Sequence, residues 1–370
     1  MSIPSLKSDA QITSNSVKFA DMAIQYSMKI VFTGGGTAGH VTPNIALINL
    51  LEGEKHYVGT DGMEKQLILP LVKNGKVKEF HTFKASKFVR KFTLSNLLLP
   101  YRLLKSIAQC RKILKNIAPD VVFGKGGYVG LPVIIAARLL KIPAIIHESD
   151  GTMGLANKIA IPFCSKVLST FPCHRKADVC GAIIRPQLYK GDRQKGLSQM
   201  GLNGKKPVIL FTGGSLGAAA LNQLAVETAP LLHDKFDIFV LSGKNKSADS
   251  PYVHQEQFVN NIEDIFAATS VAVTRGGSNT LCELTALNIP FVVLPLEKCS
   301  RGEQKVNAEY FRSRNCGTTL SENCTPEQLA KAVTQVYENR RNYIASQKQM
   351  HIDGTAEVLN RITETAKRRH

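Results

Sequence analysis

The sequence predicts an α/β protein of two Rossmann-like domains, each a parallel sheet flanked by helices, with a cleft between the domains. Three observations support this fold class: apolar runs that alternate with helix-like segments, a glycine-rich motif that occurs twice, and a chain of 370 residues of which 44% are hydrophobic. A chain of this length can bury two cores. Continuous apolar strands are typical of parallel sheets covered on both faces.

The predicted strands are each followed by glycine or polar residues and then by a helix-like segment. The first strand leads into the glycine-rich segment 34–39, and residues 32–39 reappear in outline as residues 211–218. This repeated unit indicates that a second sheet begins near Pro207. The full set of predicted strands covers residues 30–33, 121–124, 144–147, 208–212, 238–242, 271–274 and 291–295.

The domain boundaries follow from these units. Residues 185–206 are rich in glycine, lysine and polar residues, which predicts a linker. Residues 1–27 are polar and lack the basic and apolar regions of a targeting peptide, so Met28 is an alternative start. We expect a flexible N-terminal extension at 1–27, an N-terminal domain at 28–185, a C-terminal domain at 186–345, and a C-terminal helix at 346–370 that packs back on the N-terminal domain.

The composition argues against several classes of protein. The eight cysteines include no C-x-x-C pair, which favours reduced thiols over disulfides or a zinc knuckle. The longest apolar runs, at 131–137 and 291–296, are far shorter than the ~20 residues of a membrane-spanning helix. No D-x-D motif is present, so we expect no metal ion and no cofactor.

Positive charge is concentrated in one part of the chain. The formal net charge is +18, and residues 65–115 contain thirteen Lys or Arg but only one acidic residue, Glu79. Such a block indicates an anionic partner, although any single lysine is equally consistent with a solvated helical face. Apolar residues between the cations favour an anionic membrane surface over nucleic acid, for which no motif is present. The expected membrane contacts are Lys84, Lys87, Phe88, Arg90, Lys91, Phe92, Leu97 and Leu98.

Glycine loops at the ends of strands predict anion sites, because backbone N–H groups and the helix dipole there favour negative charge. The first loop contains Gly34, Gly36 and Gly39 in the G-x-G-x-x-G spacing, with Asp61 further on, so an NAD-dependent dehydrogenase is a rival interpretation. A later loop leads into Ser278, from which backbone donors could hold a diphosphate while Glu283 accepts two ribose hydroxyls. Helix capping by residues 278–280 is the alternative.

Two further positions are candidates for catalysis. His40 directly follows the first glycine loop, where it is either a general base or a structural histidine. Glu148 and Asp150 follow a strand at the edge where open α/β sheets bind ligands. These carboxylates either orient a hydroxyl or cap the next helix.

Several of these segments together resemble the bacterial MurG glycosyltransferase family over residues 28 to about 365. The matching segments are 34–43, 124–129, 147–150, 154–158, 213–218 with Asn222, 275–283, and 301–304 with 307–308. The resemblance implies a GT-B fold and inverting transfer of GlcNAc from UDP-GlcNAc to the MurNAc 4-hydroxyl of undecaprenyl-pyrophosphoryl-MurNAc-pentapeptide (lipid I), which forms lipid II for peptidoglycan. It also implies a peripheral protein on the cytoplasmic face of the cell membrane, with cell-wall and division proteins as further partners.

The same resemblance assigns roles to individual positions. His40 and Asp150 would be catalytic. The donor UDP-GlcNAc would contact Thr37, Gly39, Arg185, Ser215, Val259, Ser278, Asn279, Thr280, Glu283 and Gln304. The acceptor diphosphate would contact Gly34, Gly35, Gly36, Gly126, Gly127 and Tyr128.

The chain departs from the family pattern at three positions. Family members often carry Gln at the position of Leu216, Asn at that of Asp150 and Gln at that of Glu303, so one polar donor contact is in question at Leu216. Another GT-B glycolipid transferase, a dehydrogenase and a catalytically inactive scaffold remain as alternatives.

Overall fold

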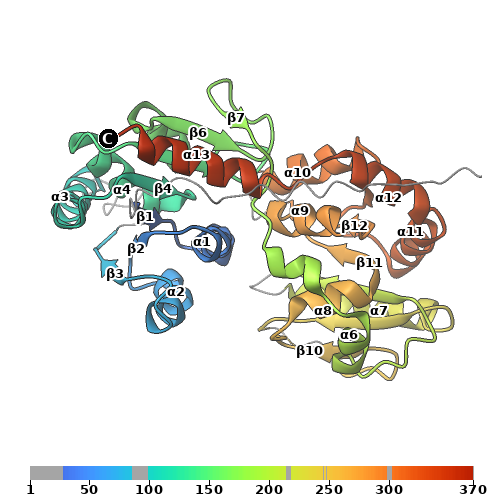
Figure 1. Ribbon diagram of the computed structural model, residues 1–370. Helices are drawn as coiled ribbons and strands as arrows, with labels where there is room; N and C mark the ends of the chain where they lie inside the picture. The colour runs from blue at the N-terminus through green and yellow to red at the C-terminus, as the bar shows by residue number, and fades with distance from the viewer. Residues whose placement is uncertain are drawn as a thin grey trace, which may run out of the picture.

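Two α/β domains lie side by side in the computed structural model (Figure 1), which describes residues 28–85, 99–213, 218–244, 246, 248–297 and 302–369. The N-terminal domain contains a seven-stranded sheet in the order β3-β2-β1-β4-β5-β6-β7, and every neighbouring pair is parallel. Its strands are β1 Lys29–Thr33, β2 Glu54–Gly59, β3 Glu79–Thr82, β4 Val121–Gly124, β5 Ala144–Glu148, β6 Lys166–Ser169 and β7 Asp178–Val179.

The C-terminal domain repeats this architecture. Its six parallel strands have the order β10-β9-β8-β11-β12-β13, which is the order of the first six strands of the other sheet. They are β8 Val208–Thr212, β9 Asp237–Leu241, β10 His254–Glu256, β11 Thr269–Thr274, β12 Phe291–Val293 and β13 Gly317–Thr319. The predicted fold class of two Rossmann-like domains is therefore confirmed.

Helices cover both faces of each sheet. In the N-terminal half these are α1 Ala38–Leu50, α2 Met63–Lys73, α3 Leu99–Ile117, α4 Gly127–Leu139 and α5 Leu155–Ala160. In the C-terminal half they are α6 Arg193–Gln199, α7 Ala219–Leu232, α8 Ile262–Ala268, α9 Ser278–Ala286, α10 Glu303–Arg312, α11 Pro326–Glu338 and α12 Arg340–Gln349. The last helix, α13 Thr355–Lys367, lies along the N-terminal domain (Figure 1), where Val358 and Ile362 pack in one core with Ile30 and Phe32.

The segment predicted as a linker is not an open loop. It contains a short 3-10 helix, Pro186–Lys190, and α6. Leu197 and Met200 from this segment lie in the core of the C-terminal domain. Gly196 is required there because a Cβ atom would lie 2.0 Å from the carbonyl oxygen of Asp264.

The strands absent from the prediction are the peripheral ones. β3, β7, β10 and β13 are edge strands, and β2 and β6 lie next to an edge. Edge strands are short and partly exposed, so they lack the continuous apolar run by which the central strands were recognised. The seven described cysteines, which exclude Cys299, form no disulfide with one another.

Candidate active site

The glycine loops lie where each sheet reverses its strand order. β1 and β4 are adjacent in the first sheet, as are β8 and β11 in the second, and in both cases later strands extend in the opposite direction from earlier ones. Open α/β sheets bind ligands at the carboxyl ends of such strand pairs. The loop after β1, the loop after β4 and the loop after β11 therefore all lie where a ligand is expected.

The two N-terminal glycine loops touch each other. A Cβ atom on Gly127 would lie 2.8 Å from the carbonyl oxygen of Gly35, and one on Gly36 would lie 2.8 Å from Cε1 of Tyr128. Gly36, Gly126 and Gly127 also have positive φ angles of 82°, 95° and 77°. These positions require glycine because of both backbone conformation and close approach. The structure thus brings the six positions predicted for the acceptor diphosphate into one place.

His40 lies between these loops. Its Nδ1 is 3.0 Å from the carbonyl oxygen of Gly35 and 3.2 Å from Oγ1 of Thr37. A carbonyl oxygen can only accept, so Nδ1 carries the proton and Nε2 keeps the lone pair. Burial lowers the pKa of His40, and the nearby carboxylates of Glu148 and Asp150 only partly oppose this. The ring is therefore arranged as a neutral imidazole that can accept a proton at Nε2.

A carboxylate that was not predicted occupies part of the first loop. Glu64 on α2 is fully buried, and its Oε2 accepts a hydrogen bond from the backbone N–H of Gly36 at 3.2 Å. Its Oε1 accepts from the backbone N–H of Thr60 at 3.0 Å. One donor of the predicted anion site is thus already engaged by an anionic side chain. Because Glu64 lies 28 residues from Gly36 in sequence, only the fold reveals this contact.

Glu148 organises the loop after β5. Its carboxylate accepts hydrogen bonds from the backbone N–H groups of Ser149, Asp150 and Gly154 and from Nδ2 of Asn157, at 2.9–3.1 Å. Glu148 is 7% exposed. Of the two roles left open for this carboxylate, the structure favours the structural one.

Asp150 is held by the opposite domain. Nδ2 of Asn307 on α10 donates to Oδ1 of Asp150 at 3.1 Å and lies 3.0 Å from the carbonyl oxygen of Gly276. Oδ1 of Asn307 accepts from the backbone N–H of Gly151 at 2.7 Å. Asn307 is fully buried, so this single side chain connects the loop after β5 with the loop after β11.

A buried lysine lies beneath the loop after β4. Nζ of Lys125 is 2.5 Å from both Nδ1 of His147 and Oγ of Ser149, and Lys125 is 2% exposed. Burial lowers the pKa of Lys125 to about 8. Burial and the neighbouring Lys125 keep the pKa of His147 well below its usual range, while Nε2 of His147 donates to the carbonyl oxygen of Gly181 at 3.0 Å. Lys125 is thus a cation directly below the two glycine loops.

Helix α9 faces the first glycine loop from the other domain. It begins at Ser278, its N-cap residue is Gly277, and no side chain caps it. The capping alternative for residues 278–280 is therefore wrong. Nδ2 of Asn279 donates to the carbonyl oxygen of Gly39 at 2.9 Å across the domain boundary. The positive end of α9 thus lies directly against the loop that carries His40.

Arg185 and Glu283 form an ion pair with two hydrogen bonds. Nε and Nη2 of Arg185 donate to the two carboxylate oxygens of Glu283 at 3.0 and 3.2 Å. Their side chains are only 20% and 12% exposed. Both residues were predicted donor contacts, and the structure places them in direct contact although 98 positions separate them in sequence.

The remaining predicted donor contacts are more dispersed. Oε1 of Gln304 accepts from the backbone N–H groups of Gly276 and Leu296, at 3.2 and 2.9 Å, so this oxygen supports the loop after β11. Val259 is half-buried against the C-terminal core. Ser215 lies outside the described residues.

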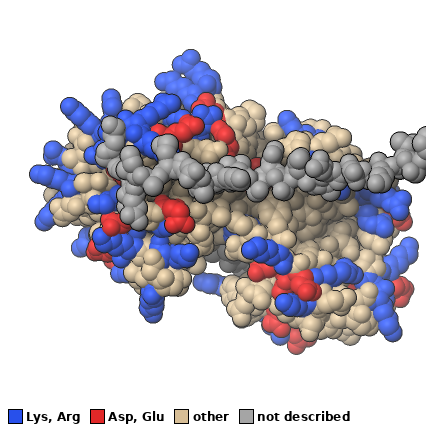
Figure 2. Space-filling model, in the orientation of Figure 1, with Lys and Arg blue, Asp and Glu red and all other residues tan. Residues whose placement is uncertain are grey.

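The predicted membrane face is described only in part. Of the eight residues predicted there, Lys84 is described and exposed; Lys87, Phe88, Arg90, Lys91, Phe92, Leu97 and Leu98 lie outside the described residues. The adjoining helix α3 exposes Tyr101 and Leu104, at 65% and 66%. Lys and Arg side chains gather over this end of the N-terminal domain (Figure 2). Among the described residues, no helix is both long enough and apolar enough to span a membrane.

Both halves of the chain match models of one enzyme family. Residues 30–169 match the glycosyltransferase family 28 N-terminal domain, and residues 208–362 match the glycosyltransferase family 28 C-terminal domain.

Curated relatives share most of the chain. A protein of Oceanobacillus iheyensis named UDP-N-acetylglucosamine--N-acetylmuramyl-(pentapeptide) pyrophosphoryl-undecaprenol N-acetylglucosamine transferase is 39% identical over 357 residues, which is 90% of this chain and 98% of the relative. A protein of the same name from Lachnoclostridium phytofermentans is 40% identical over 337 residues, 86% of this chain and 94% of the relative. Among solved structures, MurG of Acinetobacter baumannii has a TM-score of 0.71 at 24% identity and covers 91% of this chain and 99% of its own.

Proposed function

This chain belongs to glycosyltransferase family 28, and from that premise we propose that it transfers GlcNAc from UDP-GlcNAc to lipid I, which forms lipid II for peptidoglycan. It is an N-acetylglucosaminyltransferase. The observation that carries this function is the similarity of the chain, at 39% and 40% identity over almost its full length, to transferases with that name.

We propose that donor and acceptor bind on opposite sides of the domain boundary. UDP-GlcNAc would bind against the C-terminal domain, with its diphosphate at the start of α9 and its ribose at Glu283. A helix N-terminus stabilises the charge that develops on the leaving diphosphate, so no metal ion is required. The acceptor diphosphate would bind at residues 34–36 and 126–128, where Lys125 adds positive charge from below.

The transfer would be a single displacement. Nε2 of His40 removes the proton from the MurNAc 4-hydroxyl as its oxygen forms a bond to the anomeric carbon of GlcNAc, and the bond from that carbon to UDP breaks on the opposite face. Attack from the face opposite the leaving group inverts the anomeric configuration. The Nδ1–H bond from His40 to the Gly35 carbonyl supports this role because it leaves the lone pair on Nε2. Asp150 would orient the hydroxyl.

The chain's own side chains disfavour a dehydrogenase. The acidic residue expected for an NAD ribose, Asp61, is paired with Lys65 at 2.6 Å, and its side chain is 72% exposed. This ion pair already engages the carboxylate that an NAD ribose would need.

Peripheral binding to an anionic membrane is part of the proposal. Exposed Tyr101 and Leu104 lie on α3 beside the exposed cations Arg102 and Lys105. Apolar side chains enter the lipid headgroup region while the cations pair with anionic headgroups. This surface belongs to the domain that would bind the lipid-linked acceptor, and we place the protein on the cytoplasmic face.

A direct assay tests the function. The full chain is incubated with labelled UDP-GlcNAc and a lipid I analogue, and we expect UDP release together with a disaccharide-lipid product. His40→Asn should abolish transfer, whereas the same change at the exposed His254 of β10 should not. Lack of transfer by the folded chain under conditions in which a relative is active would refute the proposal. Transfer of GlcNAc to a different glycolipid would support the proposed donor site and contradict lipid I as the acceptor.

A further inference from the structure

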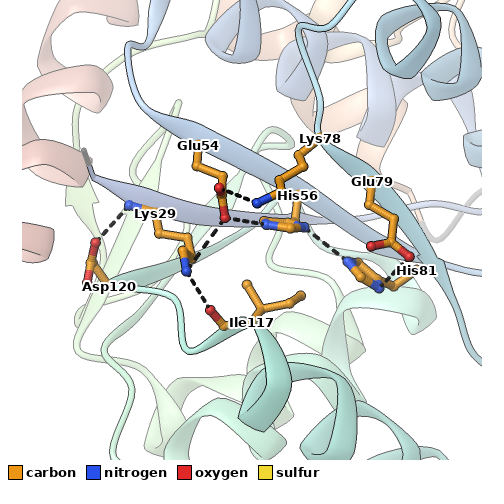
Figure 3. Close-up of polar contacts among 8 residues, drawn as sticks. All are labelled: Lys29, Glu54, His56, Lys78, Glu79, His81, Ile117 and Asp120. Atoms are coloured by element: carbon orange, nitrogen blue, oxygen red, sulfur yellow. Dashed lines mark hydrogen bonds and ion pairs between the residues drawn. The ribbon is translucent and has the colours of Figure 1, made fainter.

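A cluster of ionisable side chains lies outside the active site, on strands β2 and β3 (Figure 3). His56 and Glu79 are partners in the parallel register of these strands, so their side chains lie on the same face of the sheet. His81 lies two residues beyond Glu79 and therefore shares this face. One ligand atom from each of His56, Glu79 and His81 lies within 4.8 Å of the other two.

The two imidazole rings face each other through nitrogen atoms. Nδ1 of His56 is 3.0 Å from Nε2 of His81. Two nitrogen ligands at ~2.0–2.1 Å from a tetrahedral zinc ion are roughly 3.3 Å apart. The two nitrogens therefore need to separate by only about 0.3 Å, and the rings need to turn so that both lone pairs point at one ion.

Glu54 sets the tautomer of His56. Its Oε2 is paired with Nζ of Lys78 at 2.6 Å, so the carboxylate is ionised and can only accept. Its Oε1 is 2.9 Å from Nε2 of His56, which must therefore carry the proton. The lone pair of neutral His56 is then on Nδ1 and points at His81. In metal sites a ligating histidine commonly donates its other N–H to a carboxylate in this way.

The same reasoning leaves His81 with an unfavourable contact. If Nε2 of His81 donates its proton to His56, then Nδ1 of neutral His81 is an acceptor that faces Oε1 of Glu79 at 3.6 Å. Two acceptors then face each other. A cation bound between Nδ1 of His56 and Nε2 of His81 removes this conflict. Nε2 of His81 then presents its lone pair to the ion, and the ring proton lies on Nδ1, which faces the Glu79 carboxylate as a donor.

We propose that His56, His81 and Glu79 bind a transition-metal ion, with Zn²⁺ as the best match, and that Glu54 is a positioning residue for His56. Two imidazoles and one carboxylate suit this class of metal, and solvent completes the tetrahedron. The exposed fractions agree with this role: the His56 side chain is 6% exposed, that of His81 17%, and the Glu79 side chain is 64% exposed and free to close over the ion.

The bound ion would join the outer strand of the sheet to its neighbour. The opposite face of this strand pair is already held by Phe80, which stacks on Tyr57 with ring centroids 5.7 Å apart. Metal ligation would fix the other face. The ion has no part in the transfer reaction, so its effect is on the thermal stability of the N-terminal domain, which binding of a ligand to the folded state raises.

Cobalt and zinc titrations of the tag-free, EDTA-treated full chain test the site. We expect one equivalent of Co²⁺ to produce visible d–d absorption, Zn²⁺ to displace it, and Zn²⁺ to raise the melting temperature. His81→Gln should abolish the absorption and the thermal shift, and Glu79→Gln should weaken binding at least about tenfold. Glu54→Gln should weaken it by about 10–100-fold. His254→Gln and Glu256→Gln, on β10 of the other domain, are matched controls that should bind Co²⁺ as the wild type does.

Three results would overturn the proposal. The first is the absence of cobalt absorption in the folded wild-type chain, which would mean that a hydrogen bond, and not a metal ion, joins the two rings. The second is undiminished absorption in both His81→Gln and Glu79→Gln. The third is a thiolate charge-transfer band in place of the d–d spectrum, which would assign the ion to cysteine. Circular dichroism is used to test whether each variant is folded. Glu79→Gln tests the site even if His81→Gln unfolds, because the Glu79 side chain is exposed.

Discussion

Replacement of Glu283 by Ala should raise the Michaelis constant for UDP-GlcNAc about 150-fold and change kcat much less. A hydrogen bond to a charged group contributes about 1.5–3 kcal/mol, and a ribose offers two hydroxyls to this carboxylate. In the unbound protein the same oxygens already accept from Arg185, so part of the gain is an exchange of partners. We therefore take about 3 kcal/mol in total, which corresponds to roughly 150-fold in affinity.

The ion pair with Arg185 allows a second test. If Arg185 acts only by orienting Glu283, the double variant Arg185→Ala/Glu283→Ala should have the same Michaelis constant for UDP-GlcNAc as Glu283→Ala. If Arg185 also contacts the nucleotide, as the family resemblance implies, the double variant should bind the donor more weakly than either single variant. The two effects should still fall short of additivity, by about 0.5–3 kcal/mol, because the residues share one ion pair.

The assay is initial-rate kinetics at varied UDP-GlcNAc and saturating acceptor. Glu309→Ala is the matched control, since Glu309 on α10 is exposed and pairs only locally with Arg312. Loss of one partner from a mostly buried ion pair also destabilises the fold, so melting temperatures are measured for each variant. If folded Glu283→Ala has a Michaelis constant for UDP-GlcNAc within about twofold of wild type, Glu283 does not belong to the donor site, since a twofold change corresponds to less than about 0.5 kcal/mol.

Three further predictions concern protonation and the membrane. Because burial lowers the pKa of His40, kcat/KM should fall on the acid side of its pH profile with a midpoint below about pH 6.5, the pKa of an ordinary histidine. A midpoint above that value would exclude His40 as the base. The pKa of Lys125 is about 8 in the folded protein and about 10.4 in the unfolded chain. The unfolded chain therefore binds more protons between these two pH values, and the free energy of unfolding should rise with pH across this range by up to about 3 kcal/mol. Urea titrations should show no such rise in Lys125→Met. The double variant Arg102→Gln/Lys105→Gln should bind anionic vesicles roughly 30-fold more weakly in a sedimentation assay, at about 1 kcal/mol per cation, whereas Lys331→Gln on α11 should bind as the wild type does. Equal binding by the double variant and the wild type would show that α3 is not the membrane-binding surface.

The sequence was most informative where local pattern and fold agree. The strands β1, β4, β8 and β11 are apolar runs with a glycine at their last residue or within the next two, so they could be recognised without any tertiary information. Their loops then followed from the rule that parallel sheets bind ligands at the carboxyl ends of strands. β3, by contrast, has the sequence Glu-Phe-His-Thr, whose polar residues gave no sign of a strand.

Residues that depend on distant contacts could not be predicted. Glu64 reaches the first glycine loop only because α2 packs beside it, and the hydrogen bonds of Asn307 cross between domains. Lys125 lay within a recognised motif, yet nothing local indicates that a lysine between two glycines would be buried. Whether a polar side chain is buried, and which groups it contacts, can be recognised only when the surrounding structure is known.

The buried amide of Asn307 has a consequence for fidelity. If the domains separated, its hydrogen bonds to Asp150 and Gly151 would break, and the carboxylate that we propose to orient the acceptor hydroxyl would lose its orientation. Under the proposed mechanism, an open molecule could then bind UDP-GlcNAc without being ready to activate a nucleophile. Water that entered between the domains would meet a carboxylate that is not aligned, so we expect hydrolysis of the sugar nucleotide to be suppressed until the acceptor is enclosed.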